Sequence, residues 1–300
     1  MALVVGLALT VRWAAAGYEV GMVVDHQRVG DAATSAPVRA VVTSYFRGVA
    51  IALVGGFWAG LLVTGPAMRL IMRLLAVTAG DDAHGRLTEA EEVVGDIDLD
   101  GTLGLLVFGG LFAGLVSGVV YVVVRRWLPS GRWAGIAFGG LHLVIAATRL
   151  DPLRPDNPDF DLVGPGWLAV VTFGLAAMLH GMSVVAFANR YSSAFLPDPG
   201  THVARRRVLL PLVLPGLIAL ASIVVPMAIV AGLVLVVAAS RIGVVVEAAC
   251  SRSLVVCGRV LLAGVTAVML PGAVTDLRDI AIRDEPSALV GGSDDGASTR

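Results

Sequence analysis

The sequence predicts an all-α integral membrane protein: a bundle of about seven transmembrane helices with its N-terminus inside the cell. Apolar side chains make up 57% of the 300 residues and charged side chains only 15%, whereas soluble domains carry about 25% charged residues. The mean hydropathy is +0.84, and the apolar residues gather in runs long enough to cross a bilayer. Arginine-rich and acidic loops alternate between these runs, as the positive-inside rule requires.

The chain is expected to divide into three parts. Residues 1–46 form an N-terminal extension and linker, because Arg12 and Glu19 interrupt its apolar start, and we expect it to lie at the interface or to be poorly ordered. Ala14-Ala15-Ala16 could imitate a signal-peptidase site, so cleavage is an open alternative. Residues 47–275 form the transmembrane domain. Residues 276–300 form a disordered extracytoplasmic tail, whose composition cannot bury a core.

Each apolar run of about 19 residues or more crosses a bilayer core of about 30 Å at 1.5 Å per residue. Gly65-Pro66 is expected to kink or end the first span, leaving Met68–Leu75 as an amphipathic collar. The run 208–246 is too long for one helix and is divided at Pro226, although a single tilted, kinked helix is the alternative. The predicted spans are Gly48–Pro66, Gly101–Val124, Trp133–Thr148, Trp167–Ala188, Val208–Val225, Pro226–Val246 and Leu254–Val274.

Arginine placement predicts the orientation. Arg125, Arg126 and Arg132 fill the loop after the second span without an acid, whereas carboxylates dominate loops 81–100 and 151–161. Short basic loops stay in the cytoplasm. This pattern predicts a multi-pass membrane protein with its acidic loops outside.

Glycines at four-residue spacing, the pattern of a glycine zipper, mark the faces on which helices can pack. In lipid, helices associate through close backbone approach, which small residues permit. The pattern predicts tight packing of the first three spans, while contact with a second copy or another membrane protein through the same faces is the alternative. The glycines are Gly56 and Gly60, then Gly110, Gly114 and Gly118, then Gly131, Gly135 and Gly139.

A polar layer is predicted near the middle of the membrane, where His142 and His180 fall at similar depth on antiparallel helices and Ser117 and Ser183 lie at comparable height. Ionisable groups at this depth indicate function, because imidazole can shuttle protons. The alternative is a neutral histidine that holds helices together by hydrogen bonds. Two histidines do not fill a zinc site, and no cofactor is expected.

The acidic loops predict a charge cluster on the outer face. We expect at least one loop carboxylate to contact an arginine after the first span, although a divalent cation is the alternative partner. The predicted cluster consists of Arg69, Arg73, Asp151, Asp156, Asp159 and Asp161.

A second group of acids, Asp96, Asp98 and Asp100, matches the opening of a calcium loop. Position twelve then falls on Val107, where a bidentate glutamate is required. The alternative is local structure, with Asp100 or Thr102 capping the next helix. These three acids stay metal candidates on the opening of the motif alone.

Four segments carry a resemblance: GPAMRLIMRL after the first span, GDIDLDGTLG before the second, and LDPLRPDNPDF followed by LVGPGW before the fourth. Together they resemble a set of small multi-pass membrane proteins of high-GC bacteria that have no assigned function. The resemblance covers residues 48–188 and implies that the two outer loops belong together. It implies no activity, so no catalytic residue follows from it.

The sequence predicts a non-enzymatic membrane protein that handles a proton or a small solute through the His/Ser layer. A structural or assembly subunit of a membrane complex is the second hypothesis, and a membrane-embedded enzyme or cation sensor the third. The expected partner is the lipid bilayer. Nucleic acid is not expected, because a net charge of −1 provides no basic field.

Overall fold

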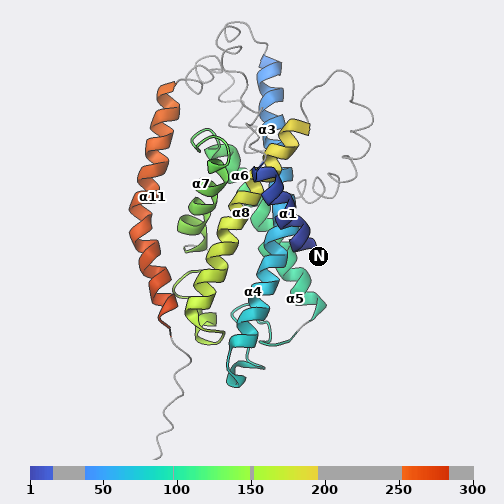
Figure 1. Ribbon diagram of the computed structural model, residues 1–300, viewed down its shortest axis with the longest axis vertical. Coiled ribbons are helices and arrows are strands. Elements are labelled where there is room, and N and C mark those ends of the chain that lie inside the picture. Colours follow the sequence, from blue (N-terminus) through green and yellow to red (C-terminus); the bar gives the residue numbers. More distant parts are fainter. Residues whose placement is uncertain (16–37, 97, 149–151, 195–251, 284–300) are drawn as a thin grey trace, which may run out of the picture.

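The computed structural model describes residues 1–15, 38–96, 98–148, 152–194 and 252–283. Within these ranges all regular secondary structure is helical, apart from one antiparallel bridge between Leu87 and Val93. The all-α prediction is therefore confirmed for the described part of the chain. The long helices run along one common axis (Figure 1).

The bundle is built from helices that change type along their length. The described helices are α1 (Ala2–Ala15), α3 (Val38–Ala59), α4 (Gly65–Thr78), α5 (Leu99–Gly104), α6 (Ala113–Val124), α7 (Trp133–Leu141), α8 (Gly166–Ala194) and α11 (Arg252–Ala281). Three π-helical pieces continue or connect them: η1 (Gly60–Thr64), η3 (Leu105–Phe112) and η4 (His142–Ala147). Two short 3₁₀ turns, η2 (Asp81–Ala83) and η5 (Pro158–Asp161), lie in the loops.

Four of the described helices are long and apolar enough to cross a membrane: Gly48–Thr78, Leu99–Val124, Gly166–Ser192 and Val255–Ala281. They coincide with the first, second, fourth and last predicted spans. The third predicted span is a shorter apolar helix, Trp133–Ile145. The fifth and sixth fall outside the described residues, so the count of seven and the side of the N-terminus stay predictions.

The first span does not end at Pro66. One helix of 31 residues runs from Gly48 to Thr78, so Gly65-Pro66 does not end the span, and the predicted amphipathic collar Met68–Leu75 is part of the same helix. Proline lacks an N–H donor and normally interrupts a helix, but here it occupies the first turn of α4, directly after the π-helical turn η1. The wider π turn accommodates the proline, and the helix continues.

The N-terminal segment differs from the expected interfacial extension. Residues 2–15 form α1, which packs against α8 and η1. A Cβ at Gly6 would meet the carbonyl oxygen of Leu62 at 2.6 Å, and Thr10 is only 1% exposed. Residues 2–15 therefore belong to the bundle. At the other end, α11 continues to Ala281, into the predicted tail, and residues 284–300 lie outside the described part.

Glycines bring the first two long helices into backbone contact. A Cβ on Gly56 or Gly60 would overlap the carbonyl oxygens of Gly114 and Gly110 respectively, and one at Gly118 would lie 2.8 Å from the carbonyl oxygen of Ala52. On the next pair, a Cβ at Gly139 would lie 2.5 Å from the carbonyl oxygen of Met178 on α8. The predicted close approach is therefore present between the first two spans, whereas the third span packs its glycines against α8, the fourth predicted span, and Gly131 has nothing within 4 Å.

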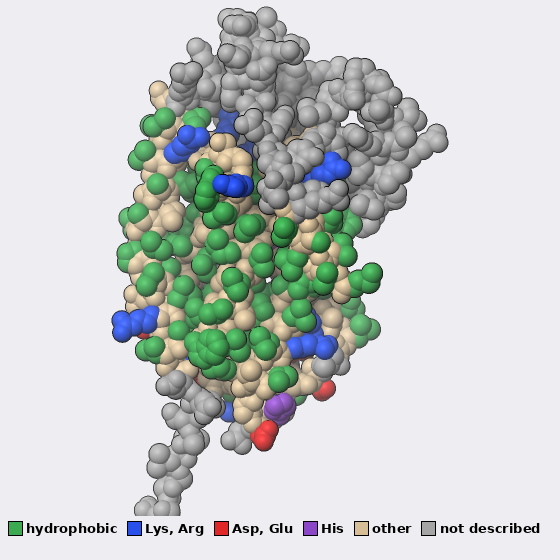
Figure 2. Space-filling view, viewed as in Figure 1, with side chains coloured by type: hydrophobic (Ala, Val, Ile, Leu, Met, Phe, Trp, Pro, Cys, Tyr) green, Lys and Arg blue, Asp and Glu red, His purple; other side chains and the backbone are tan. Residues whose placement is uncertain are grey.

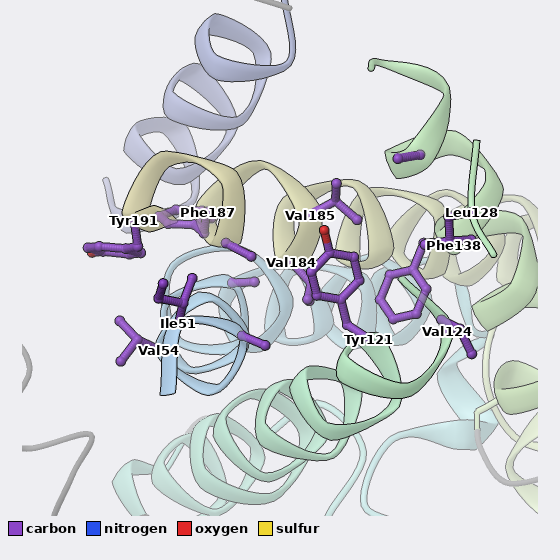
Figure 3. Close-up of a cluster of buried hydrophobic side chains, with 14 of the residues drawn as sticks. Ile51, Val54, Tyr121, Val124, Leu128, Phe138, Val184, Val185, Phe187 and Tyr191 are labelled. Atoms are coloured by element: carbon purple, nitrogen blue, oxygen red, sulfur yellow. The ribbon is translucent and has the colours of Figure 1, made fainter. Parts of the chain in front are cut away.

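Two large apolar clusters fill the described part of the bundle, beside a smaller one around Phe57. One surrounds Tyr121 and Phe138, whose ring centroids lie 5.3 Å apart, and includes residues of α3, α6, α7 and α8 (Figure 3). The other lies towards the acidic loops and joins Leu75 of α4 to Phe160 and Phe173. The middle of α8, between Ala176 and Val184, separates the two clusters.

The two acidic loops form one cap at the end of the bundle. Leu153, Phe160 and Val163 of the second loop share an apolar cluster with Ala83 and Val94 of the first. The prediction that the two acidic loops belong together is confirmed. In the view of Figure 2, the acids and the histidine lie towards one end of an apolar surface, whereas basic side chains lie near both ends.

Candidate functional site

Two histidines and a serine meet between the apolar clusters. The Oγ of Ser117 on α6 lies 2.6 Å from Nε2 of His180 and 2.7 Å from Nε2 of His142. The two imidazole rings lie 5.1 Å apart at 71°. His142 begins η4 and His180 lies in the middle of α8, so the structure brings together three of the four predicted members of the polar layer.

Thr64 extends the layer to a fourth helix. Its Oγ1 lies 2.5 Å from Nδ1 of His180 and 3.3 Å from the carbonyl oxygen of Ala59. Thr64 ends η1, and His142 starts η4, so π-helical turns present both side chains; such turns are frequent at functional sites. We name Thr64, His180, Ser117 and His142 the histidine chain.

The contact between His142 and the backbone of Phe138 fixes the direction of every hydrogen bond in the histidine chain. Nδ1 of His142 lies 3.0 Å from the carbonyl oxygen of Phe138, which can only accept, so Nδ1 carries the proton. In the neutral ring Nε2 of His142 then accepts from the Ser117 hydroxyl. Ser117 in turn accepts from Nε2–H of His180, whose Nδ1 accepts from Thr64. The neutral chain therefore runs one way, with every donor paired.

Burial makes these hydrogen bonds important to the fold. His180 is 5% exposed, Ser117 4% and Thr64 8%, whereas His142 is only half-buried. The ring of Phe138 also packs edge-on against His142, with centroids 4.5 Å apart. An unsatisfied polar group at such a position costs free energy, so each member of the histidine chain needs its neighbours.

Ser183 is not part of the histidine chain. Its Oγ donates to the carbonyl oxygen of Leu179 at 2.7 Å and lies 3.1 Å from Oγ1 of Thr10 on α1. Thr10 also donates to the carbonyl oxygen of Gly6 at 2.8 Å. Ser183 therefore joins α8 to α1, one turn away from His180 along α8.

The described loop acids do not pair with Arg69 or Arg73, the arginines of the predicted charge cluster. Arg154 pairs with Glu89 and, at 3.3 Å, with Asp156, and Arg283 pairs with Asp161 at 3.3 Å. Among the described residues, no ion pair joins Arg69 or Arg73 to Asp156, Asp159 or Asp161, and Asp151 lies outside them. Sequence reasoning missed Glu89 and Arg283 because the fold of the cap and the extension of α11 determine where they lie.

Asp159 connects the two acidic loops. Its Oδ1 accepts a hydrogen bond of 2.8 Å from the backbone N–H of Glu89. Burial raises the pKa of Asp159, and the nearby Glu89 carboxylate adds to this, whereas the Glu89 N–H and Arg154 oppose it. Asn157 begins the adjacent turn by accepting from the Asp159 N–H at 2.8 Å, which is the Asx-Pro turn chemistry expected of this loop.

The calcium-like segment serves as a helix start. Oδ1 of Asp98 accepts from the backbone N–H of Gly101 at 3.0 Å and caps α5, so the cap is Asp98 and not Asp100 or Thr102. In the described ranges, no group of three or more His, Cys, Asp or Glu side chains is placed to hold a metal ion. Asp96, Asp98 and Asp100 therefore do not converge on a common site.

No protein-family model, curated protein or solved structure matches this chain. Its function is therefore argued from its own contacts. In the described part, the histidine chain is the best candidate for a functional site. Imidazole groups in general can gain and lose a proton near neutral pH, and hydroxyl groups can relay one.

Proposed function

We propose that this protein handles protons in a bacterial cytoplasmic membrane through the histidine chain. The observation that carries the proposal is the Ser117 hydroxyl, which lies within hydrogen-bond distance of both imidazoles. Titratable groups are rare within membrane-spanning helices because their burial is costly, so those that occur there are functional candidates by default.

The histidine chain can hold one additional proton without losing a hydrogen bond. If His142 is protonated, its Nε2–H donates to Ser117, and Ser117 donates to Nε2 of His180. His180 then donates from Nδ1 to Thr64, which turns its own proton to the carbonyl oxygen of Ala59 at 3.3 Å. The second acceptor of Thr64 therefore allows the whole chain to reverse.

Ser117 can pass the additional proton between the rings. The His142 Nε2–H proton moves to Ser117 Oγ while the Ser117 proton moves to Nε2 of His180. His142 is then neutral, His180 carries the charge, and Ser117 donates back to His142. Both arrangements pair every donor, so the proton has two positions joined by two short hydrogen bonds.

A structural subunit is the second candidate, and the carbonyl of Phe138 favours it. A carbonyl accepts but cannot relay a proton onward, so the histidine chain ends at that point. In this alternative the chain only holds α4, α6, α7 and α8 in register, in the same way as the glycine contacts.

Proton flux in vesicles distinguishes the two candidates. The full chain is reconstituted with a pH-sensitive dye inside, and a potential is imposed with potassium and valinomycin. We expect flux above that of protein-free vesicles for the wild type, a return to that background for Ser117→Ala, and wild-type flux for Ser183→Ala.

Ser183→Ala is the matched control, because it removes an equally buried hydroxyl from outside the histidine chain. Equal flux in both variants, or wild-type flux no greater than that of empty vesicles, would overturn the proposal. If the protein is instead a structural subunit, wild-type flux should be no greater than that of empty vesicles, and Ser117→Ala should be less stable than the wild type.

A further inference from the structure

Arg69 and Arg73 of α4 lack a counter-ion within the described chain. The Nε and Nη2 atoms of Arg69 are buried and have no hydrogen-bond partner among the described residues. Arg73, one turn further along, is exposed, and it forms no ion pair with a described acid. Guanidinium groups hold five donors and are always charged, and among the described residues these two charges face no anion.

The described acids of the cap do not supply an anion to Arg69 or Arg73. Glu89 and Asp156 form ion pairs with Arg154, and Asp161 forms one with Arg283. Asp159 accepts a hydrogen bond from the backbone N–H of Glu89. α4 itself carries no acidic residue. The two positive charges of Arg69 and Arg73 are therefore uncompensated by the described part of the protein.

The length of the helix places both arginines at the edge of the hydrocarbon. A helix of 31 residues is about 46 Å long at 1.5 Å per residue, roughly 16 Å more than the bilayer core. If the excess is divided between both ends, about 8 Å extends into each headgroup region. Arg73 lies five residues before Thr78, which is about 8 Å from the helix end, and Arg69 lies one turn deeper.

Apolar side chains next to the arginines face outwards. Leu70 is 55% exposed, Leu74 42% and Val77 79%. Arg73 lies on this exposed stripe, and Arg69 lies at its edge, on the side where Gly65 contacts Leu106 of η3. Long arginine side chains at such a depth turn towards the headgroups.

We propose that Arg69 and Arg73 together bind the phosphate of one anionic phospholipid of the outer leaflet. Residues at i and i+4 of a helix are neighbours, with Cβ atoms about 5–6 Å apart, so the exposed Arg73 holds the phosphate, and the Arg69 side chain, whose Nε and Nη2 are buried in the protein alone, turns outwards to share it. Arginine binds phosphate through paired hydrogen bonds. The acyl chains then lie along Leu70, Leu74 and Val77, and the additional positive charge selects an anionic over a zwitterionic headgroup.

Thermal unfolding of the full-length, delipidated protein in detergent tests the site. Phosphatidylglycerol, phosphatidylcholine and inorganic phosphate are titrated separately. For the wild type, we expect the Tm to rise and saturate with phosphatidylglycerol, to rise less with phosphatidylcholine, and not to change with inorganic phosphate. A saturating rise with inorganic phosphate equal to that with phosphatidylglycerol would overturn the lipid assignment.

The double variant Arg69→Gln/Arg73→Gln should lose the rise with phosphatidylglycerol. Arg86→Gln should keep it, because Arg86 is an exposed arginine of the acidic cap at the same end of the bundle. An equal rise in all three proteins would refute the site.

If the double variant does not fold, a second measurement tests the same site. Arg69→Lys/Arg73→Lys keeps both charges but not the paired donors, and we expect native mass spectrometry to find less bound phosphatidylglycerol in it than in the wild type. Unchanged retention of the lipid would contradict the proposal. Neither result depends on whether the histidine chain carries protons.

Discussion

Replacing Ser117 with alanine removes the hydroxyl that joins the two histidines. In the wild type this hydroxyl accepts from His180 at 2.6 Å and donates to His142 at 2.7 Å. The variant leaves Nε2–H of His180 without a partner at a residue that is 5% exposed, and it leaves Nε2 of His142 without a donor. Alanine fits in the place of serine, so loss of the hydrogen bonds dominates the effect.

The expected loss of stability follows from two estimates that agree. Single hydrogen bonds between helices in a membrane contribute about 0.6 kcal/mol on average and about 1.7 kcal/mol at most, so two such bonds amount to about 1–3 kcal/mol. A buried donor without an acceptor also costs about 1–3 kcal/mol. We therefore expect Ser117→Ala to lower the free energy of unfolding by about 2 kcal/mol.

Reversible unfolding in mixed detergent micelles measures this loss. Ser183→Ala is the comparison, since Thr10 still donates to the carbonyl oxygen of Gly6 when the Ser183 hydroxyl is absent. The free energy of unfolding of Ser183→Ala should fall by less than about 1 kcal/mol, because this variant leaves no buried donor unpaired. If the two alanine variants unfold at the same denaturant concentration, the reasoning about the histidine chain is wrong.

Three further predictions follow from the contacts. Nitrogen-15 NMR at neutral pH should find the ring proton of His142 on Nδ1 and that of His180 on Nε2, and the opposite tautomer at either ring would contradict the assigned hydrogen-bond direction. Gly114→Ala should destabilise the bundle by about 1–3 kcal/mol through overpacking, whereas Gly104→Ala, with nothing within 4 Å, should not. Because the pKa of Asp159 is raised in the folded protein, the folded state binds its proton more tightly, so stability should fall as pH rises from about 4. Asp159→Asn should remove this contribution to the pH dependence of the free energy of unfolding, which unfolding experiments at several pH values measure.

Most of the candidate site could be predicted from the sequence. Helical geometry alone places His142, His180 and Ser117 at one depth, because the rise per residue is constant. Thr64 was missed because Pro66 was expected to kink or end the first helix near that position, which would put Thr64 at the membrane edge. The π turn at Gly60–Thr64 lets the helix continue, and Thr64 thereby lies in its middle.

The partners of Ser183 and of the loop acids could not be predicted. Ser183 contacts Thr10 because α1 packs into the bundle, and an apolar segment interrupted by charge gives no sign of that packing. Arg154 pairs with Asp156 within one loop. Arg283 pairs with Asp161, because α11 continues beyond its predicted end and brings Arg283 to the cap. Charge pattern indicates which loops share a face, but it does not indicate which side chains meet.

The sequence by itself determined the all-α class, the described membrane-length helices and the glycine positions at which helices touch. These follow from composition, from the fixed rise of a helix and from the absence of a Cβ, all of which are local properties. Only the tertiary structure decided that Ser117 bridges the histidines, that Thr64 completes the chain, and that Arg69 and Arg73 lack an acidic partner. These contacts depend on how helices rotate and extend against one another, and packing over the whole bundle determines both.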